Sequence, residues 1–410
     1  MLNIPKHEIM DLTSNEPFWL VKNGLLNSFP SLKVDIKTEI LIVGGGITGA
    51  LMAHKCMEKG YETTLIDRRE IANGSTSATT SMLQYEIDIP LFKLTEMIGL
   101  SGAEANYWAG HEAINDLSDI VKEIKSDCGF KKKESLYYAA FKKDVNDLER
   151  EFEARKACGL PVEWLSAEQI KKRYQLQNTH GGILSEQGAS VDAFKLTHDL
   201  LAFNSKRGLK VYDKTNVKET SYSKNKVELS TEYGDKITAN KVIYCNGYES
   251  TEMIKDDFVK LLSTFVMIGE CNEDDQSHLN DTLFWNTTKP YIYFRTTDDN
   301  RLLIGGEDED FVNPEKRDEF IKEKTKKLEK QLKKILPNYS FRPDFSWAGT
   351  FGETKDGLPY IGVHPNFENS FFLLGFGGNG ITFSVIGTGV IGAMLNNEIH
   401  PLAEYYKFRR

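Results

Sequence analysis

Short apolar runs of strand length alternate with helical patterns near the start of the chain. Residues 38–43 form one apolar run, residues 50–59 have a helical pattern, and residues 62–67 form a second apolar run. This order predicts a strand–helix–strand unit. The preceding residues, 1–36, are polar apart from an amphipathic segment at residues 18–20, and they predict an N-terminal arm.

The same two patterns continue along the rest of the chain. Helices are predicted at residues 101–127, 144–158, 192–206 and 315–336. Strands are predicted at residues 135–141, through most of 209–246, and in a hairpin formed by residues 291–295 and 301–305. The small, polar residues 72–80 predict a loop. Strand–helix sequence at both ends and strand-rich sequence between them predict an α/β chain with a discontinuous nucleotide-binding domain and a second, inserted domain.

Residues 369–397 carry no charge and are long enough to cross a bilayer. The stretch is rich in glycine and has Asn379 near its middle. These features favour a buried strand, a turn and a buried helix, so no membrane insertion is expected.

Composition and charge exclude several classes of function. A net charge of −9 and a pI near 5.6 give no whole-chain attraction to nucleic acid, and no such partner is expected. The nine Lys and Arg residues between positions 315 and 334 are expected to form a solvated helix face, and the acidic run 307–310 a solvated loop. The five cysteines include no C-x-x-C pair, and the N-terminus lacks a signal-peptide pattern, which predicts reduced thiols and a cytoplasmic location. The histidine spacing predicts no metal site.

The pattern G-x-G-x-x-G occurs three times, first at Gly44, Gly46 and Gly49, between the first predicted strand and helix. Such glycines allow a tight turn and a close approach of the backbone to a pyrophosphate, and the helix start offers free N–H groups. Asp67 ends the second predicted strand, 18 residues after Gly49, where a carboxylate can accept hydrogen bonds from an adenosine ribose. We therefore predict a dinucleotide site. Asp67 disfavours NADP but leaves FAD and NAD open.

The other two occurrences have no second strand with an acidic residue after them. The one that runs from Gly375 through Gly377 to Gly380 follows a predicted strand and can form a cradle of backbone N–H groups at a helix start. The one at residues 387–392 lies inside the predicted helix and indicates close packing.

Six segments, in order along the chain, resemble the D-amino-acid-oxidase-like (DAO) family of FAD-dependent oxidoreductases. They are ILIVGGGITGA (40–50), TTLIDRREIANGSTSATTSMLQ (63–84), KVIYCNGYES (241–250), RLLIGGE (301–307), DGLPYIG (356–362) and FFLLGFGGNGIT (371–382). The resemblance implies a Rossmann-like FAD-binding domain with an inserted α+β substrate domain built on an antiparallel sheet. We expect the arm at 1–36, the FAD-binding domain at 37–95, 186–250 and 345–410, and the substrate domain at 96–185 and 251–344.

The resemblance also implies which residues contact FAD. The pyrophosphate is expected at Gly44, Gly46, Ile47, Thr48 and Gly49, and the adenosine ribose at Asp67 and Arg68. Further contacts are expected from the loop residues Ser75, Thr76, Ser77, Thr79 and Thr80, from Val217 at the adenine, and from Gly247. Backbone N–H groups of Gly378, Asn379, Gly380, Ile381 and Thr382 are expected at the pyrimidine edge of the flavin, where they stabilise negative charge. Members with covalent flavin use a late cysteine; none follows Cys271, so binding is expected to be non-covalent.

The chain departs from the family at the positions that bind the substrate carboxylate and activate oxygen. Glycine-oxidase-like members carry an arginine for the substrate carboxylate at two positions, which are Phe351 and Gly378 here. Sarcosine-oxidase-like members carry an oxygen-activating lysine where this chain has Leu303, which favours a dehydrogenase over an oxidase.

The candidate substrate residues alternate along one predicted strand. Tyr291, Tyr293 and Arg295 are expected on one face, where Arg295 can replace the missing arginine as a carboxylate ligand. The alternative is two packing tyrosines and an exposed hairpin arginine.

The resulting expectation is an FAD-dependent oxidoreductase that oxidises the C–N bond of an amine or amino acid by hydride transfer to flavin N5, with an unknown electron acceptor. Two alternatives stay open, namely an NAD-dependent dehydrogenase and a non-catalytic flavin-binding subunit of a larger redox complex.

Overall fold

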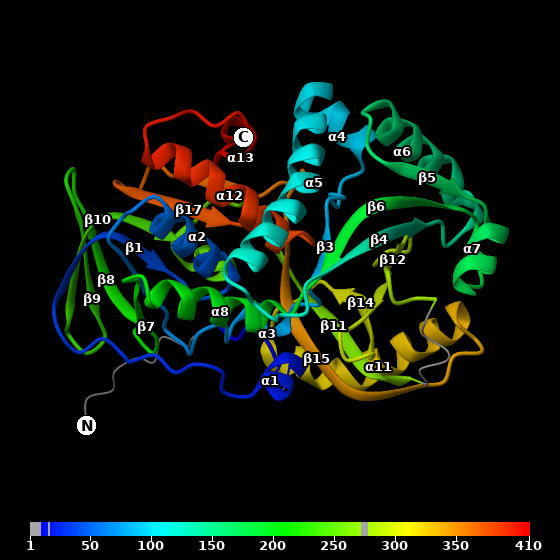
Figure 1. The fold of residues 1–410 in the computed structure, drawn as a ribbon, viewed down its shortest axis with the longest axis horizontal. Coiled ribbons are helices and arrows are strands. Elements are labelled where there is room, and N and C mark those ends of the chain that lie inside the picture. Colours follow the sequence, from blue (N-terminus) through cyan, green and yellow to red (C-terminus); the bar gives the residue numbers. More distant parts are fainter. Residues whose placement is uncertain (1–9, 15–16, 272–277) are drawn as a thin grey trace.

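The computed structural model describes residues 10–14, 17–271 and 278–410, and this part of the chain is built around two sheets (Figure 1). Residues 1–9 and 15–16 of the predicted arm lie outside the described residues.

The first sheet contains the predicted strand–helix–strand unit. Its main path runs β16 (Tyr360–Val363), β17 (Ser370–Leu374), β10 (Lys236–Tyr244), β1 (Ile36–Val43), β2 (Thr63–Ile66) and β7 (Lys210–Tyr212), and β9 (Val227–Thr231) joins β10 to β8 (Val217–Tyr222). β17, β10, β1, β2 and β7 are parallel. Val43 pairs with both Ile66 and Tyr244, so the carboxyl ends of β1, β2 and β10 meet at one edge. In doubly wound sheets this edge is where ligands bind.

Four helices pack together beside this sheet, namely α2 (Ile47–Glu58), α5 (Leu100–Glu123), α8 (Ala193–Ser205) and α12 (Gly380–Leu395) (Figure 1). The buried strand, turn and helix predicted for residues 369–397 are β17 and α12. A Cβ on Gly387 would lie 2.9 Å from Leu373 Cγ, which confirms the close packing predicted for the third glycine pattern. Within the described residues, no helix is both long and apolar enough to cross a membrane.

The second sheet is largely antiparallel. Its path runs β15 (Phe341–Glu353), β11 (Lys260–Cys271), β14 (Leu302–Glu309), β13 (Tyr293–Thr296), β12 (Thr282–Asn286), β4 (Lys131–Tyr138), β6 (Gly182–Ser190) and β3 (Met82–Gln84), with β5 (Val162–Leu165) beside β6. Among the described strands of this second sheet, only β4 and β12 form a parallel pair. α11 (Pro314–Ile335) packs on β11, β14 and β15 through Leu328, Leu332 and Ile335.

The remaining described elements are short or peripheral. They are α1 (Phe18–Asn23), α3 (Ser75–Ala78), α4 (Leu91–Ile98), η1 (Lys142–Asp144), α6 (Val145–Ala157), α7 (Ala167–Tyr174), η2 (Gly247–Glu249), α9 (Ser250–Met253) and α13 (Ala403–Tyr406).

Two local predictions need correction. The loop predicted at 72–80 contains the one-turn helix α3. Two of the nine cations of α11 are not solvated, because Arg317 is buried beside Asp11 and Asp318, and Lys324 is buried beside Glu307 and Glu309. The predicted domain boundaries stay a prediction, although β3 and most of β15, which were placed within the FAD-binding domain, pair with strands of the second sheet.

Candidate functional site

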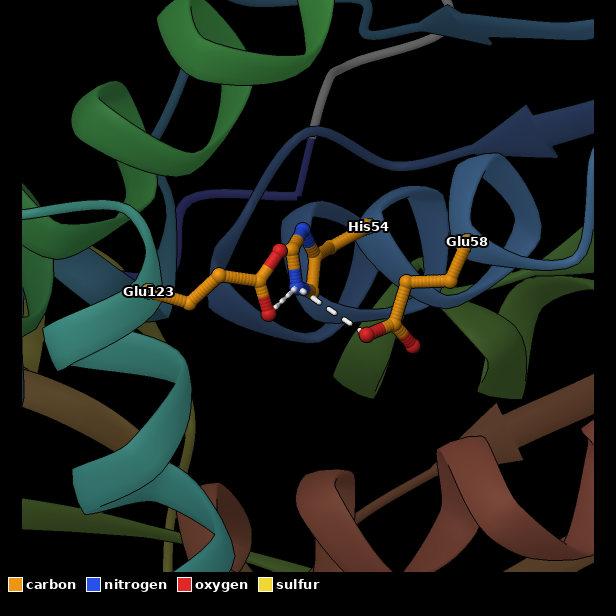
Figure 2. Close-up of side chains that lie close together, drawn as sticks. All are labelled: His54, Glu58 and Glu123. Atoms are coloured by element: carbon orange, nitrogen blue, oxygen red, sulfur yellow. Dashed lines mark ion pairs between the residues drawn. The ribbon is translucent and has the colours of Figure 1, made fainter.

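One cluster outside the main cavity brings a histidine and two carboxylates together. His54 Nε2 lies 3.7 Å from a carboxylate oxygen of Glu58 and 3.7 Å from one of Glu123 (Figure 2). The Asn204 amide donates to the Leu200 carbonyl at 2.8 Å and faces His54 Nδ1 at 3.1 Å, which makes Nδ1 the accepting nitrogen. Nε2 of the neutral ring then carries the hydrogen and offers no lone pair to a cation. We interpret the cluster as a polar link between α2, α5 and α8.

The main cavity has a volume of about 490 Å³ and lies at the carboxyl edge of the first sheet. Val43, Ile66 and Tyr244, at the ends of β1, β2 and β10, form part of its wall. A second wall comes from the other sheet and includes Thr264, Val266, Trp285, Tyr293 and Asp308. The cavity therefore joins the carboxyl edge of the first sheet to the second sheet.

The first glycine turn has no room for side chains. Gly44 has φ +114°, and a Cβ on it would lie 2.5 Å from the Cys245 carbonyl oxygen. A Cβ on Gly49 would lie 1.8 Å from the Gly44 oxygen, so Gly49 serves the packing of α2 against the turn. Gly49 itself does not line the cavity, whereas Gly46, Ile47 and Thr48 at the start of α2 do.

Asp67 follows β2 and lines the cavity. Its two carboxylate oxygens accept hydrogen bonds from the backbone N–H groups of Gly45 (2.6 Å) and Arg69 (2.7 Å). Burial raises the pKa of Asp67 to about 6, against the lowering effect of these two bonds. Arg68 and Arg69 also line the cavity and both pair with Glu249.

The hydroxyl-rich segment after β2 forms another part of the wall. Ser75, Thr76, Thr79 and Thr80 line the cavity, while the Ser77 hydroxyl donates to the Gly74 carbonyl. Thr76 Oγ1 also accepts from the Ile47 N–H at 3.0 Å, which ties this segment to the start of α2.

Three side chains hold three consecutive carbonyls of this segment. Trp347 Nε1 donates to Ala78 O (2.9 Å), Trp19 Nε1 to Thr79 O (2.6 Å), and Arg295 Nε to Thr80 O (2.8 Å). The three donors come from β15, α1 and β13, so elements distant in sequence fix the wall.

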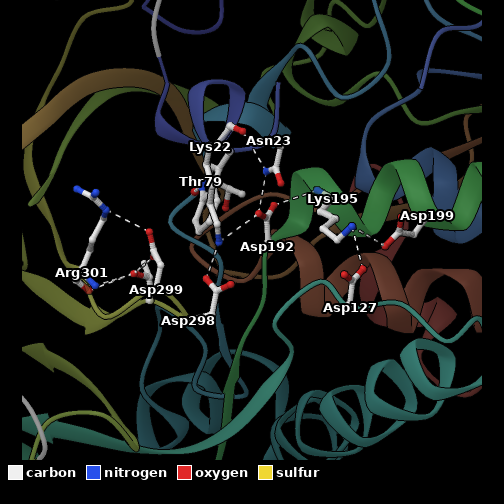
Figure 3. Close-up of polar contacts among 12 residues, drawn as sticks. Lys22, Asn23, Thr79, Asp127, Asp192, Lys195, Asp199, Asp298, Asp299 and Arg301 are labelled. Atoms are coloured by element: carbon white, nitrogen blue, oxygen red, sulfur yellow. Dashed lines mark hydrogen bonds and ion pairs between the residues drawn. The ribbon is translucent and has the colours of Figure 1, made fainter. Parts of the chain in front are cut away.

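The N-terminal arm takes part in this arrangement. Phe18 and Trp19 of α1 are buried. Beside them, Lys22 pairs with Asp298 at 2.6 Å, and Asn23 donates to Asp192 at 2.8 Å (Figure 3). These contacts attach α1 to the turn between β13 and β14 and to the start of α8.

Arg295 lies elsewhere than predicted. Tyr291 and Tyr293 line the cavity, but Arg295 does not. Its guanidinium is buried, donates to the carbonyls of Thr80 and Thr296, and lies 5.7 Å from the centre of the Trp19 ring. Arg295 is therefore neither an exposed hairpin residue nor a group that faces the cavity.

The second glycine turn lies between β17 and α12. Gly378, Asn379, Gly380 and Ile381 line the cavity, whereas the Thr382 hydroxyl donates to the Gln84 carbonyl. The Gly378 N–H donates to the Asp88 carboxylate at 2.9 Å. Val217 and Gly247 line the cavity as well.

Sequence reasoning missed five acidic residues of the cavity wall, namely Glu86, Asp88, Glu249, Glu252 and Asp308. Asp308 belongs to the acidic run 307–310, which was expected to be a solvated loop. Residues 307–309 instead end β14, and Glu307 and Glu309 pair with Lys324 while Asp308 lines the cavity. Alternation along a strand was the available signal, because it separates Asp308 from its two acidic neighbours.

The comparisons with known proteins agree over most of the chain. Residues 39–393 match the family model described as FAD dependent oxidoreductase (DAO). Glycine oxidase of Geobacillus kaustophilus is 24% identical over 368 residues, which cover 87% of this chain and 92% of that protein. Gamma-glutamylputrescine oxidoreductase of Escherichia coli is 23% identical over 397 residues, which cover 90% and 86%.

A shorter match and a solved structure complete the comparison. A Rieske 2Fe-2S iron-sulfur protein of Bacillus subtilis is 30% identical over 145 residues, which span 35% of this chain and only 28% of that protein. The fold is similar to that of L-proline dehydrogenase from P. horikoshii, with a TM-score of 0.77 at 19% identity, covering 91% of this chain and 97% of the other.

Proposed function

The chain belongs to the DAO family of FAD-dependent oxidoreductases, and we propose that its cavity oxidises the C–N bond of an amine or amino acid. The family establishes an enzyme with FAD as its cofactor and removes the NAD-dependent alternative. The observation that carries the proposal is the single cavity lined by both glycine turns and by a second wall of aromatic and acidic side chains.

The residues present fit FAD. Gly44 and Gly46 line the cavity without side chains, and the start of α2 directs backbone groups to the same space. Arg68 Nε and Asn246 Oδ1 belong to the cavity wall and are buried without a hydrogen-bond partner in the protein. We propose that the pyrophosphate lies at α2, the ribose at Asp67, and the flavin against Gly378–Ile381, without a covalent link.

When bound, FAD supplies the ring that accepts a hydride from the substrate carbon. The chain's own groups orient the substrate and stabilise charge. The start of α12 presents backbone N–H groups whose dipoles favour an anion beside Gly380 and Ile381. Val266, Phe351 and Trp285 contribute apolar surface that excludes water from the second wall.

We propose a dehydrogenase rather than an oxidase. Leu303, at the position of the oxygen-activating lysine, is fully buried in β14 and does not line the cavity. Free thiols at Cys56, Cys128, Cys158 and Cys245 support the cytoplasmic location in this proposal.

The proposal is tested with the purified, FAD-loaded protein mixed anaerobically with a panel of amines and amino acids. Bleaching of the visible flavin absorption by at least one compound supports the proposal, and slower reoxidation by oxygen than by a dye supports a dehydrogenase. If dithionite bleaches the flavin but no amine or amino acid does, the proposed reaction is wrong.

A further inference from the structure

We propose that the substrate is a cationic amine whose ammonium group binds between the carboxylates of Asp88 and Asp308, and that it carries no carboxylate beside the reacting carbon. This inference rests on the proposed function and specifies its substrate class.

Asp308 is a residue of the cavity wall with one unpaired carboxylate oxygen. It lies near the end of β14 and lines the cavity, and the Thr264 hydroxyl hydrogen-bonds to its carboxyl group. The other oxygen, Oδ1, is buried without a hydrogen-bond partner. A buried carboxylate oxygen without a donor is costly, so this position suits a ligand that brings donors and positive charge.

Asp88 provides the second carboxylate. It accepts the Gly378 N–H at 2.9 Å, and solvent in the cavity reaches its side chain. A Cβ on Gly378 would lie 2.9 Å from Asp88 Oδ1 and 3.2 Å from the Tyr291 hydroxyl. Asp88 and Tyr291 therefore flank the turn that also faces the cofactor position.

Aromatic rings lie in the same part of the cavity. The centroids of the Tyr291 and Tyr293 rings are 5.7 Å apart, and Trp285 lies 6.5 Å from Tyr291. All three rings line the cavity. Aromatic faces attract ammonium groups, so the rings and the two carboxylates favour the same kind of ligand.

Positive charge in the described wall is confined to the other side of the cavity. The lining cations are Arg68 and Arg69, which follow β2, and Lys218 on β8. Both arginines already pair with Glu249. Lys324 is near Asp308 but lies 2.6 Å from Glu309 and 3.6 Å from Glu307. A substrate carboxylate would therefore meet two acidic residues with no free cation on the second wall.

The same carboxylates also suit the product. One of the two carboxylates would first take a proton from the ammonium group, which leaves the neutral amine. Loss of a hydride from this amine leaves an iminium cation on the substrate, and the hydrogen with its electron pair passes to FAD. The carboxylate that stays ionised would stabilise the developing positive charge.

The test is calorimetric binding of two probes of equal size and opposite charge, n-butylammonium and butyrate, to the FAD-loaded protein at pH 8. We expect n-butylammonium to bind at least tenfold more tightly than butyrate, and Asp308→Asn and Asp88→Asn each to weaken it at least tenfold. Asp310→Asn is the matched control, because Asp310 follows β14, pairs with Lys260 and does not line the cavity. It should change the affinity less than twofold.

Tighter binding of butyrate, or n-butylammonium binding unchanged in both cavity variants, would overturn the inference. If a variant fails to fold, the comparison of the two probes on the unaltered protein still tests the inference.

Anaerobic reduction of the flavin separates this inference from the proposed function. Flavin bleached by zwitterionic amino acids but not by simple amines overturns the substrate class and keeps the oxidoreductase. Flavin bleached by neither class, with n-butylammonium still bound through Asp308, supports the ammonium site and overturns the proposed oxidation of a C–N bond.

Discussion

Asp308 lies in the cavity wall, and its surroundings disfavour the ionised form of its carboxyl group. Burial raises its pKa to about 6, and repulsion from Glu353 and Asp88 adds to this, against the Thr264 hydrogen bond and the attraction of Lys324. The neighbouring Glu307 and Glu309 pair with Lys324, and the hydroxyls of Tyr291 and Tyr293 also interact with Asp308. An ionised side chain that lowers the stability of the ligand-free protein and lines a ligand cavity is typical of a functional position.

The affinity for n-butylammonium should fall as the pH falls through about 6, because protonation of Asp308 removes one of the two binding charges. Calorimetry between pH 5 and 8 measures this. The Asp308→Asn variant should show a flatter profile over the same range, and an equally steep profile in that variant would exclude Asp308 as the titrating group.

We expect ionised Asp308 to lower the stability of the protein while it strengthens amine binding. The pKa of Asp308 is about 6 in the folded protein and 3.8 ordinarily, so the protonated carboxyl favours the folded state over the unfolded state. This contribution to the free energy of unfolding is fully present below pH 3.8 and is lost as the pH rises through about 6. At pH 8, Asp308→Asn should therefore raise the Tm of the ligand-free protein by about 2 °C while weakening amine binding. Asp310→Asn is the control in thermal unfolding, and a lower Tm for Asp308→Asn would contradict the account.

Arg295 acts on the cavity through the Thr80 carbonyl, so we regard it as a positioning residue. Arg295→Met should loosen the 78–80 segment and weaken FAD binding about tenfold or more, as expected for loss of a charged hydrogen bond. Fluorescence titration of FAD measures this, with Arg342→Met at an exposed position of β15 as control. Unchanged FAD affinity together with weakened butyrate binding would instead restore Arg295 as a carboxylate ligand.

At the scale of elements, α12 shows how tightly helices pack on the first sheet. A Cβ on Gly387 would meet Leu373 Cγ at 2.9 Å and Ile361 Cδ1 at 3.0 Å, whereas one on Gly389 would meet only His400 Nε2, at 3.8 Å. Both glycines lie within the same helix.

These two positions form a matched pair for mutation. Gly387→Ala should destabilise the protein by about 1–3 kcal/mol through overpacking. Gly389→Ala should be neutral or stabilise it by up to about 1 kcal/mol, because alanine favours the helix. Denaturant unfolding measures both, and equal effects would show that α12 does not pack as described.

The elements that could be predicted are those whose signals are local. The glycine turn at Gly44 and the strand–helix–strand unit lie within one continuous segment, and the structure confirms them. Trp19, Arg295 and Trp347 come from three distant segments, so no local pattern reveals that they hold neighbouring carbonyls. Asp308 was missed because its burial depends on how β14 packs, which an acidic run by itself does not indicate.

At the scale of the molecule, the cavity depends on both sheets and on the N-terminal arm. α1 contributes Trp19 to the wall segment and Lys22 to the turn between β13 and β14 (Figure 3). A ligand that bridges both walls should therefore stabilise the whole fold.

Removal of FAD should lower the Tm of the protein, and added FAD should restore it in a concentration-dependent manner, because binding to the folded state alone shifts the unfolding equilibrium. The expected effect is about 3 kcal/mol at a FAD concentration one hundred times the Kd. Calorimetric scans at several FAD concentrations measure it. A Tm independent of FAD would contradict the placement of the cofactor in the cavity.

The most direct test of the central claim is anaerobic titration of the FAD-loaded protein with primary and secondary amines while the visible flavin spectrum is recorded. We expect that a carboxylate-free amine bleaches the flavin absorption and that Asp308→Asn requires a higher amine concentration for the same bleaching. A flavin that dithionite reduces but no amine or amino acid reduces would contradict it.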